Sequence, residues 1–194
     1  MIVIRAVRAA GFSIVELMVT IAIVAILAAI AGPSIDQLTR RTKLDADTER
    51  FQSAMAYARS EAIKRSTTVS MVPSATGFSG GWRIITDDGT QNPNCTLSTA
   101  QGEEVLRVQD ALSPTTTYVV GTDAGAGTGP VDCDTAPTTV NACISYKAGG
   151  ASVATGGGFL AQAMCLRDNI NPTTMYRAIT LNSTGQGFLV KVAR

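Results

Sequence analysis

The 194-residue chain contains no histidine, and only 5% of its residues are aromatic. Histidine titrates near neutral pH, and it completes most catalytic triads and many zinc sites. The sequence therefore offers none of the sites that depend on an imidazole. The formal net charge is only +1, which argues against a broadly basic nucleic-acid-binding protein.

Nucleotide-binding motifs are missing as well. No G-x-x-x-x-G-K-[ST] loop and no strand–GxGxxG–helix arrangement occurs, so the 18 glycines indicate turns rather than phosphate binding. We expect no catalytic, cofactor-binding or metal-binding residues, and no enzymatic activity. Asp87-Asp88-Gly89 suggests calcium, but the wider loop spacing is absent and we expect a solvated turn.

One long apolar run, from Leu17 to Ile35, carries no charge. Its length suffices to cross a hydrocarbon core of roughly 30 Å as a helix. Arg5 and Arg8 precede it, and no acid comes before Glu16, so the rest of the chain should point outward from the cytoplasm. Three hypotheses remain: a secretory signal cleaved after the Ala29–Ala31 segment, an ordinary anchor, or an anchor processed near its start.

Residues 11–17, Gly-Phe-Ser-Ile-Val-Glu-Leu, resemble the class III signal of type IV prepilins and type II secretion pseudopilins. The resemblance implies a leader peptide over residues 1–11, cleavage between Gly11 and Phe12 by prepilin peptidase, and N-methylation of Phe12. Glu16 matches the family's glutamate, which pairs with the terminal amine of a neighbouring subunit and sets the axial register. Pro33 matches the family's helix proline, which would kink the helix.

Beyond residue 35 the sequence becomes amphipathic. Its apolar stripe has helical spacings of three, four and seven and contains Phe51, Ala54, Met55, Ala58, Ala62 and Ile63. The opposite face carries charges at Asp47, Glu49, Arg50, Arg59, Glu61, Lys64 and Arg65. We expect one helix over residues 12–65, with a transmembrane and polymerisation half (12–35) and an amphipathic half (36–65).

Residues 51–65 also resemble a helix of the FimT/GspH branch of these proteins. The matching positions are Ala58, Arg59, Glu61, Ala62, Ile63 and Arg65, with Met55 in place of a leucine.

Residues 66–194 contain short β-prone runs separated by turn-rich stretches. The expected strands are 67–72, 82–86, 105–109, 117–120, 142–146, 159–166, 176–181 and 188–192, and the last two form a hairpin. Residues 121–139 are rich in glycine and threonine and indicate a long loop. The prediction is an α+β, pilin-like fold, in which the long N-terminal helix packs on a periplasmic antiparallel β-sheet domain.

The four cysteines, Cys95, Cys133, Cys143 and Cys165, all follow the apolar run. The expected topology places them in an oxidising space, which favours two disulfides. A zinc site would need all four thiolates at irregular spacing. Three connectivities exist, and the sequence does not choose among them.

The resemblance implies a structural subunit that is not an enzyme. We expect a minor pilin of the FimT/FimU kind that incorporates into a type IV pilus or primes its assembly. Its partners would be prepilin peptidase, other pilins and the inner membrane, which it would cross once before it joins the fibre. The alternative in the same architecture is a GspH-like minor pseudopilin of type II secretion.

A third hypothesis is a pilus-associated subunit that binds DNA for natural transformation. Residues 144–194 carry a net charge of +4, and Lys191 and Arg194 are the candidate DNA contacts. The Gly-Arg-x-Arg tail of DNA-binding FimT proteins is absent, because the corresponding residues 185–188 read Gly-Gln-Gly-Phe.

Overall fold

A computed structural model describes residues 11–87, 95, 102–121, 133, 143–153 and 162–190, with the backbone alone for residues 29–34, 121 and 190. The chain divides into two compact units, Met1–Thr39 and Arg40–Arg194. Helix α1 (Ile14–Arg65) is 52 residues long and includes Pro33. Its N-terminal part belongs to the first unit and its C-terminal part to the second. The helix ends at Arg65, and the next residue, Ser66, has a left-handed φ of 53°. Lys64 and Arg65 in the last turn interact favourably with the negative end of the helix dipole.

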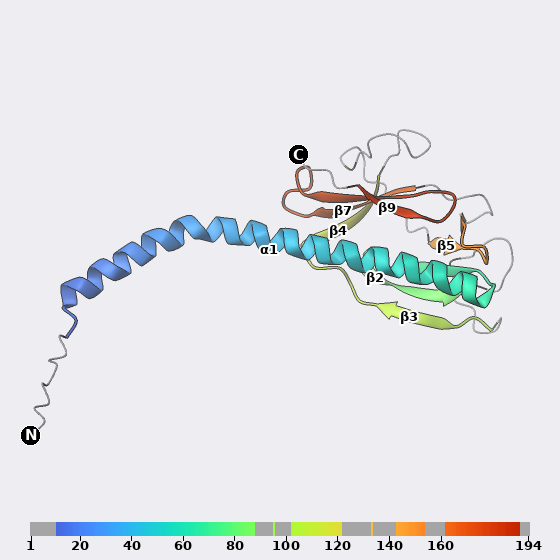
Figure 1. The fold of residues 1–194 in the computed structure, drawn as a ribbon, viewed down its shortest axis with the longest axis horizontal. Helices are drawn as coiled ribbons and strands as arrows, with labels where there is room; N and C mark the ends of the chain where they lie inside the picture. The colour runs from blue at the N-terminus through green and yellow to red at the C-terminus, as the bar shows by residue number, and fades with distance from the viewer. Residues whose placement is uncertain are drawn as a thin grey trace, which may run out of the picture. The chain divides into compact units, whose positions relative to one another are not determined.

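Two antiparallel sheets make up the rest of the second unit, and Figure 1 shows the C-terminal half of α1 lying along them. The first sheet has the order β3-β2-β1-β5-β6. Its strands are β1 (Val69–Ser74), β2 (Gly77–Thr86), β3 (Val105–Gln109), β5 (Ile144–Tyr146) and β6 (Ser152–Val153). The second sheet has the order β4-β7-β8-β9. Its strands are β4 (Thr116–Gly121), β7 (Gln162–Asp168), β8 (Tyr176–Leu181) and β9 (Gly187–Val190).

The main core lies between α1 and the inner faces of both sheets. The predicted stripe of α1 is buried there, with Phe51, Ala58 and Ala62 fully enclosed, except that Ile63 is 50% exposed. The Phe51 ring makes edge contacts with Phe78 and Trp82 of β2, at centroid distances of 5.4 and 5.3 Å. Tyr118 of β4 lies 5.4 Å from the same ring. Aromatic pairs of this kind add about 0.5–1.5 kcal/mol each beyond area burial, so Phe51 joins the helix to both sheets.

The outer face of each sheet carries a smaller apolar cluster that contains a disulfide. On the first sheet, Val72 and Ile85 pack with Cys143 and Cys95, and these two cysteines are bonded. On the second sheet, the cluster contains Val119, Cys133, Ala163, Cys165, Tyr176 and Ala178, and Cys133 is bonded to Cys165. Each disulfide therefore holds one residue of a connecting segment against the outer face of a different sheet, which gives the connectivity that the sequence left open.

Removing a disulfide should destabilise the second unit. Replacing Cys133 and Cys165 together by alanine is expected to lower the free energy of unfolding by about 3 kcal/mol, because the cross-link restricts the unfolded chain. Removing the Cys95–Cys143 pair should cost slightly more, since the loop that it closes is longer (48 against 32 residues). Guanidinium titration of the full chain in detergent, followed by fluorescence of the single, buried Trp82, measures both losses. A double variant as stable as the parent would contradict this account.

The predicted α+β fold with a long helix on antiparallel sheets is confirmed. The strands at 105–109 and 176–181 occur with the expected bounds, and β8 pairs with β9 as the predicted hairpin. The sequence analysis missed β6, which has two residues, and the first half of β2, where Gly77 pairs with Ser74 of β1 across a tight turn. Residues 159–161 and 191–192 of the expected strands lie outside the described residues, as does most of the loop at 121–139.

Candidate functional site

The first candidate surface is the apolar N-terminal segment. Every large apolar side chain between Phe12 and Leu27 has more than half of its surface exposed, from 52% to 80%. Contiguous apolar surface of this extent on a single chain marks a site of interaction. Within the part of the chain that the structure describes, no helical stretch has the length and apolarity that crossing a bilayer requires.

Glu16 lies in the first turn of α1, where a carboxylate interacts favourably with the positive end of the helix dipole. Gly11 and Phe12 come just before the helix, and Phe12 is 75% exposed. Ser13 directly precedes the first helical residue, so Ser13 and Glu16 have the spacing of a capping box. The predicted cleavage position therefore lies outside the helix. Glu16 is placed to stabilise the start of its own helix, in addition to its predicted role between subunits.

The remaining predicted residues fall in different places. Pro33 lies in α1, and the structure gives its backbone alone. The four cysteines form the two disulfides described above. Lys191 and Arg194, the candidate DNA contacts, lie outside the described residues.

Part of the charged face of α1 faces the protein rather than solvent, contrary to the sequence-based expectation. Asp47 is 1% exposed, because its carboxylate accepts a hydrogen bond from the backbone N–H of Ser113 (3.0 Å) and pairs with Arg50 (3.2 Å). Asp45 likewise pairs with Arg177 of β8 at 2.7 Å. These contacts fix α1 to both the segment before β4 and the second sheet.

Asp87 also differs from the expected solvated turn. It is 2% exposed and its carboxylate accepts a hydrogen bond from Ser70 Oγ at 3.3 Å, while Ser70 shares a second hydrogen bond with Ser145 at 2.7 Å. The predicted solvation is wrong for Asp87, because its side chain folds under the outer face of the first sheet, while Asp88 and Gly89 lie outside the described residues. Within the described residues, no three Cys, Asp or Glu side chains come together in a way that could hold a metal ion.

Glu61 is at the centre of an ion-pair network at the end of α1. Its carboxylate accepts hydrogen bonds from Arg65 Nε (3.0 Å) and Lys64 Nζ (3.1 Å), and Arg65 also pairs with Glu104 beside β3 (2.9 Å). The hydrogen bond from Arg65, followed by that from Lys64, lowers the pKa of Glu61 below its usual value. The network connects the helix end to the first sheet.

This lowered pKa predicts a loss of stability in acid. A depressed carboxyl pKa contributes stability above the unfolded value near 4.5, and that contribution is lost as the pH falls through the lower folded value. Below about pH 4, the parent should therefore lose more stability than Glu61→Gln. Thermal unfolding between pH 3 and 7 tests this, with Glu49→Gln as a control on the exposed face of the same helix. Parallel pH profiles for the parent and Glu61→Gln would refute it.

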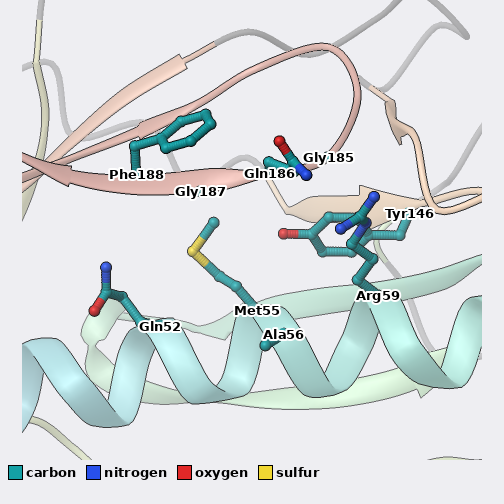
Figure 2. Close-up of a pocket in the computed structure, with 9 residues that line it drawn as sticks. All are labelled: Gln52, Met55, Ala56, Arg59, Tyr146, Gly185, Gln186, Gly187 and Phe188. Atoms are coloured by element: carbon teal, nitrogen blue, oxygen red, sulfur yellow. The ribbon is translucent and has the colours of Figure 1, made fainter.

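A second candidate surface is a cavity of about 360 Å³ between α1 and β9. Figure 2 shows Gln52, Met55 and Arg59 rising from the helix toward the strand, with the Tyr146 hydroxyl directed toward the same space. Residues 185–188 form the opposite wall. Burial raises the pKa of the Tyr146 hydroxyl above its usual range, although the Arg59 charge lowers it in part, so the hydroxyl stays neutral.

Arg59 connects α1 to two turns of the sheets. Its Nε donates to Gly150 O (2.9 Å) and its Nη2 donates to Thr184 O (3.2 Å). Gly150 and Gly185 meet directly beneath the guanidinium, and both have a left-handed φ, of 78° and 79°. The sequence analysis named Arg59 as a charge on the polar face and as part of a family helix, but not its contacts, because its partners are 91 and 125 residues away.

Comparison with known families agrees with this architecture. A family described as "Type II transport protein GspH" matches residues 47–185, and the "Prokaryotic N-terminal methylation motif" matches residues 7–32. The chain belongs to the GspH family. Its matched part covers residues 47–65 of α1 and every described strand except β9, so this GspH-family chain has the architecture of a minor pilin or pseudopilin.

Solved structures similar to this GspH-family chain include the type IV minor pilin FimU of Pseudomonas aeruginosa. FimU is 17% identical with a TM-score of 0.54, and the match covers 79% of this chain and 92% of FimU. The minor pseudopilin EpsH from the type 2 secretion system of Vibrio cholerae is 10% identical with a TM-score of 0.48, over 76% and 96% of the two chains. No curated protein sequence matches the chain significantly. The similarity to FimU shows a shared fold.

Proposed function

We propose that this GspH-family chain is a minor type IV pilin that incorporates into a pilus or primes its assembly. The observation that carries the proposal is the methylation motif at residues 7–32, which overlaps the N-terminal part of α1, where every described large apolar side chain from Ile14 to Leu27 is more than half exposed. Shielding such surface from water, by lipid or by neighbouring helices, stabilises it by about 25 cal/mol per Å² of apolar surface. The fold shared with FimU supports the pilus as the appendage.

In this proposal prepilin peptidase cleaves between Gly11 and Phe12 and methylates Phe12. The position of both residues ahead of α1 supports this step, because a peptidase needs an extended, accessible peptide. Glu16 then pairs with the terminal amine of a neighbouring subunit, and Pro33 adjusts the path of the helix. The inner membrane holds the N-terminal segment before assembly, and the two-sheet unit lies in the periplasm.

Processing is tested by mass spectrometry of the protein extracted from its native cells. The expected first residue is N-methylated Phe12. Chains that begin at Met1 or at Gly32 would contradict the proposal, since Gly32 would be the first residue after an ordinary signal cleavage following Ala31. Protein from cells that lack prepilin peptidase serves as the control and should retain Met1.

A minor pseudopilin of a type II secretion system is the second candidate, and the description of the matched family favours it. Deleting the gene distinguishes the minor pilin from the minor pseudopilin. If the chain is a minor pilin, surface pili should be lost while secretion of exported enzymes stays unchanged. The opposite pattern would identify a pseudopilin, and no change in either appendage would refute both.

A further inference from the structure

The cavity between α1 and β9 contains a cation, Arg59, that has no acidic partner among the residues that the structure describes. Arg59 is half-buried, and its two hydrogen bonds go to neutral carbonyl groups, Gly150 O and Thr184 O. No carboxylate of the described residues lies within ion-pair distance of it. A guanidinium has five N–H donors in a planar fork that matches a carboxylate. The charge that complements this site is therefore negative.

The walls of the cavity determine what kind of molecule could carry that negative charge. Met55 and Ala56 of α1 provide apolar surface, and the amides of Gln52 and Gln186 lie at the sides. Gly185 and Gly187 have no side chains, so backbone forms the wall on the side of β9. A partly apolar cavity with a few polar groups suits a peptide side chain and its flanking backbone.

Strand β9 is an edge of the second sheet, because it pairs with β8 alone among the described strands. Its residues Phe188 and Leu189 are 52% and 36% exposed. An edge strand presents unpaired N–H and C=O groups that can accept a further strand from another chain. A helix has no free backbone groups to offer such an edge, so the edge favours an extended partner.

We propose that this groove binds an extended segment of a neighbouring pilin subunit, which adds to the edge of β9 and places a carboxylate on Arg59. The inference rests on the proposed function, because the partner is a subunit of the same fibre. The segment would carry an Asp or Glu next to apolar residues, which pack over Met55 and along Phe188.

Photo-crosslinking in cells that assemble fibres tests the proposal with the full chain. A p-benzoylphenylalanine at Gln52, at the rim of the groove, should crosslink to a pilin subunit at a segment with an acidic residue nearby. The same group at Arg83, which is exposed on β2 of the first sheet, is the control and should give little of this product. A Gln52 crosslink no stronger than the Arg83 control would overturn the proposal, as would a crosslink that maps to an apolar helix.

A pair of charge variants supplies a second measurement that leaves the bonds of Arg59 in place. Gln186 is exposed and lines the groove. Gln186→Glu should reduce the crosslink by about fivefold through repulsion of the incoming carboxylate, while Gln186→Lys should preserve or increase it. Equal yields from the two variants would overturn the proposal.

The two possible failures are distinguishable by assaying the fibres for the chain itself. A chain that is present in fibres but shows no groove crosslink refutes the docking proposal alone. A chain that is absent from fibres refutes the proposed function, and the docking proposal with it.

Discussion

Replacing Gly185 by alanine is expected to destabilise the two-sheet unit by about 4 kcal/mol. An alanine with a left-handed backbone costs about 1–2 kcal/mol, and overpacking against rigid atoms costs about 1–3 kcal/mol more. Gly185 has a φ of 79°, and an added Cβ would overlap the backbone oxygen of Gly150, which also accepts the hydrogen bond from Arg59. Neither turn can move without breaking the contact between helix and sheets.

Gly187→Ala is the matched control, two residues further along the chain. Its φ is not left-handed, and a Cβ there would approach the flexible end of Met55 at 3.2 Å and Ile179 at 3.7 Å. We expect a change of less than about 1 kcal/mol, because Met55 can shift. Guanidinium titration followed by Trp82 fluorescence compares the two variants. If both variants lose the same free energy of unfolding, the close contact between Gly185 and Gly150 does not contribute to stability in the way described.

Replacing Glu16 by leucine or glutamine is expected to reduce incorporation into fibres by at least about tenfold. Removing one partner of a buried charge pair costs about 3–5 kcal/mol, since it leaves the other charge uncompensated. In the proposed fibre that other charge is the amine of Phe12 on a neighbouring subunit. Quantitative immunoblots of sheared fibres, normalised to the chain retained in the membrane, measure the effect.

Ser13→Ala separates this role from helix capping. Ser13 and Glu16 have capping-box spacing at the start of α1, and loss of a cap costs about 0.5–2 kcal/mol of helix stability. If Glu16 acts between subunits, Ser13→Ala should incorporate nearly as well as the parent. If Ser13→Ala and Glu16→Gln lower incorporation equally, the carboxylate acts through its own helix and the register hypothesis is wrong.

The sequence was informative where the physical signal is local. The stripe that contains Phe51, Ala58 and Ala62 follows from helical spacing, and strand β8 and its hairpin with β9 follow from β-prone runs around a turn. Strand β6 was missed because two residues are too few to show the alternation of apolar and polar side chains that indicates a strand. The N-terminal motif could be identified without knowledge of the fold, since a peptidase recognises the local sequence of an extended peptide.

The charged residues of α1 were harder to interpret because their partners are distant in the sequence. Asp47 is buried only because the backbone of Ser113 donates to it, and Arg59 is fixed only because Gly150 and Thr184 turn toward it. Helical spacing places such residues on one face but does not show whether that face meets solvent or another turn. The groove beside β9 is built from three separated segments and was not predictable for the same reason.

The disulfide pattern has a consequence for how the chain matures. Cys133 and Cys143 are the nearest neighbours in the sequence, yet each is bonded to a cysteine on the far side of the other. Loop-closure entropy favours contact between close neighbours, so oxidation of the nascent chain should first form the wrong pair. Reaching the native arrangement then requires thiol–disulfide exchange. Formation of the native pairs should therefore include a reshuffling step, and added disulfide isomerase should speed the appearance of correctly bonded chain.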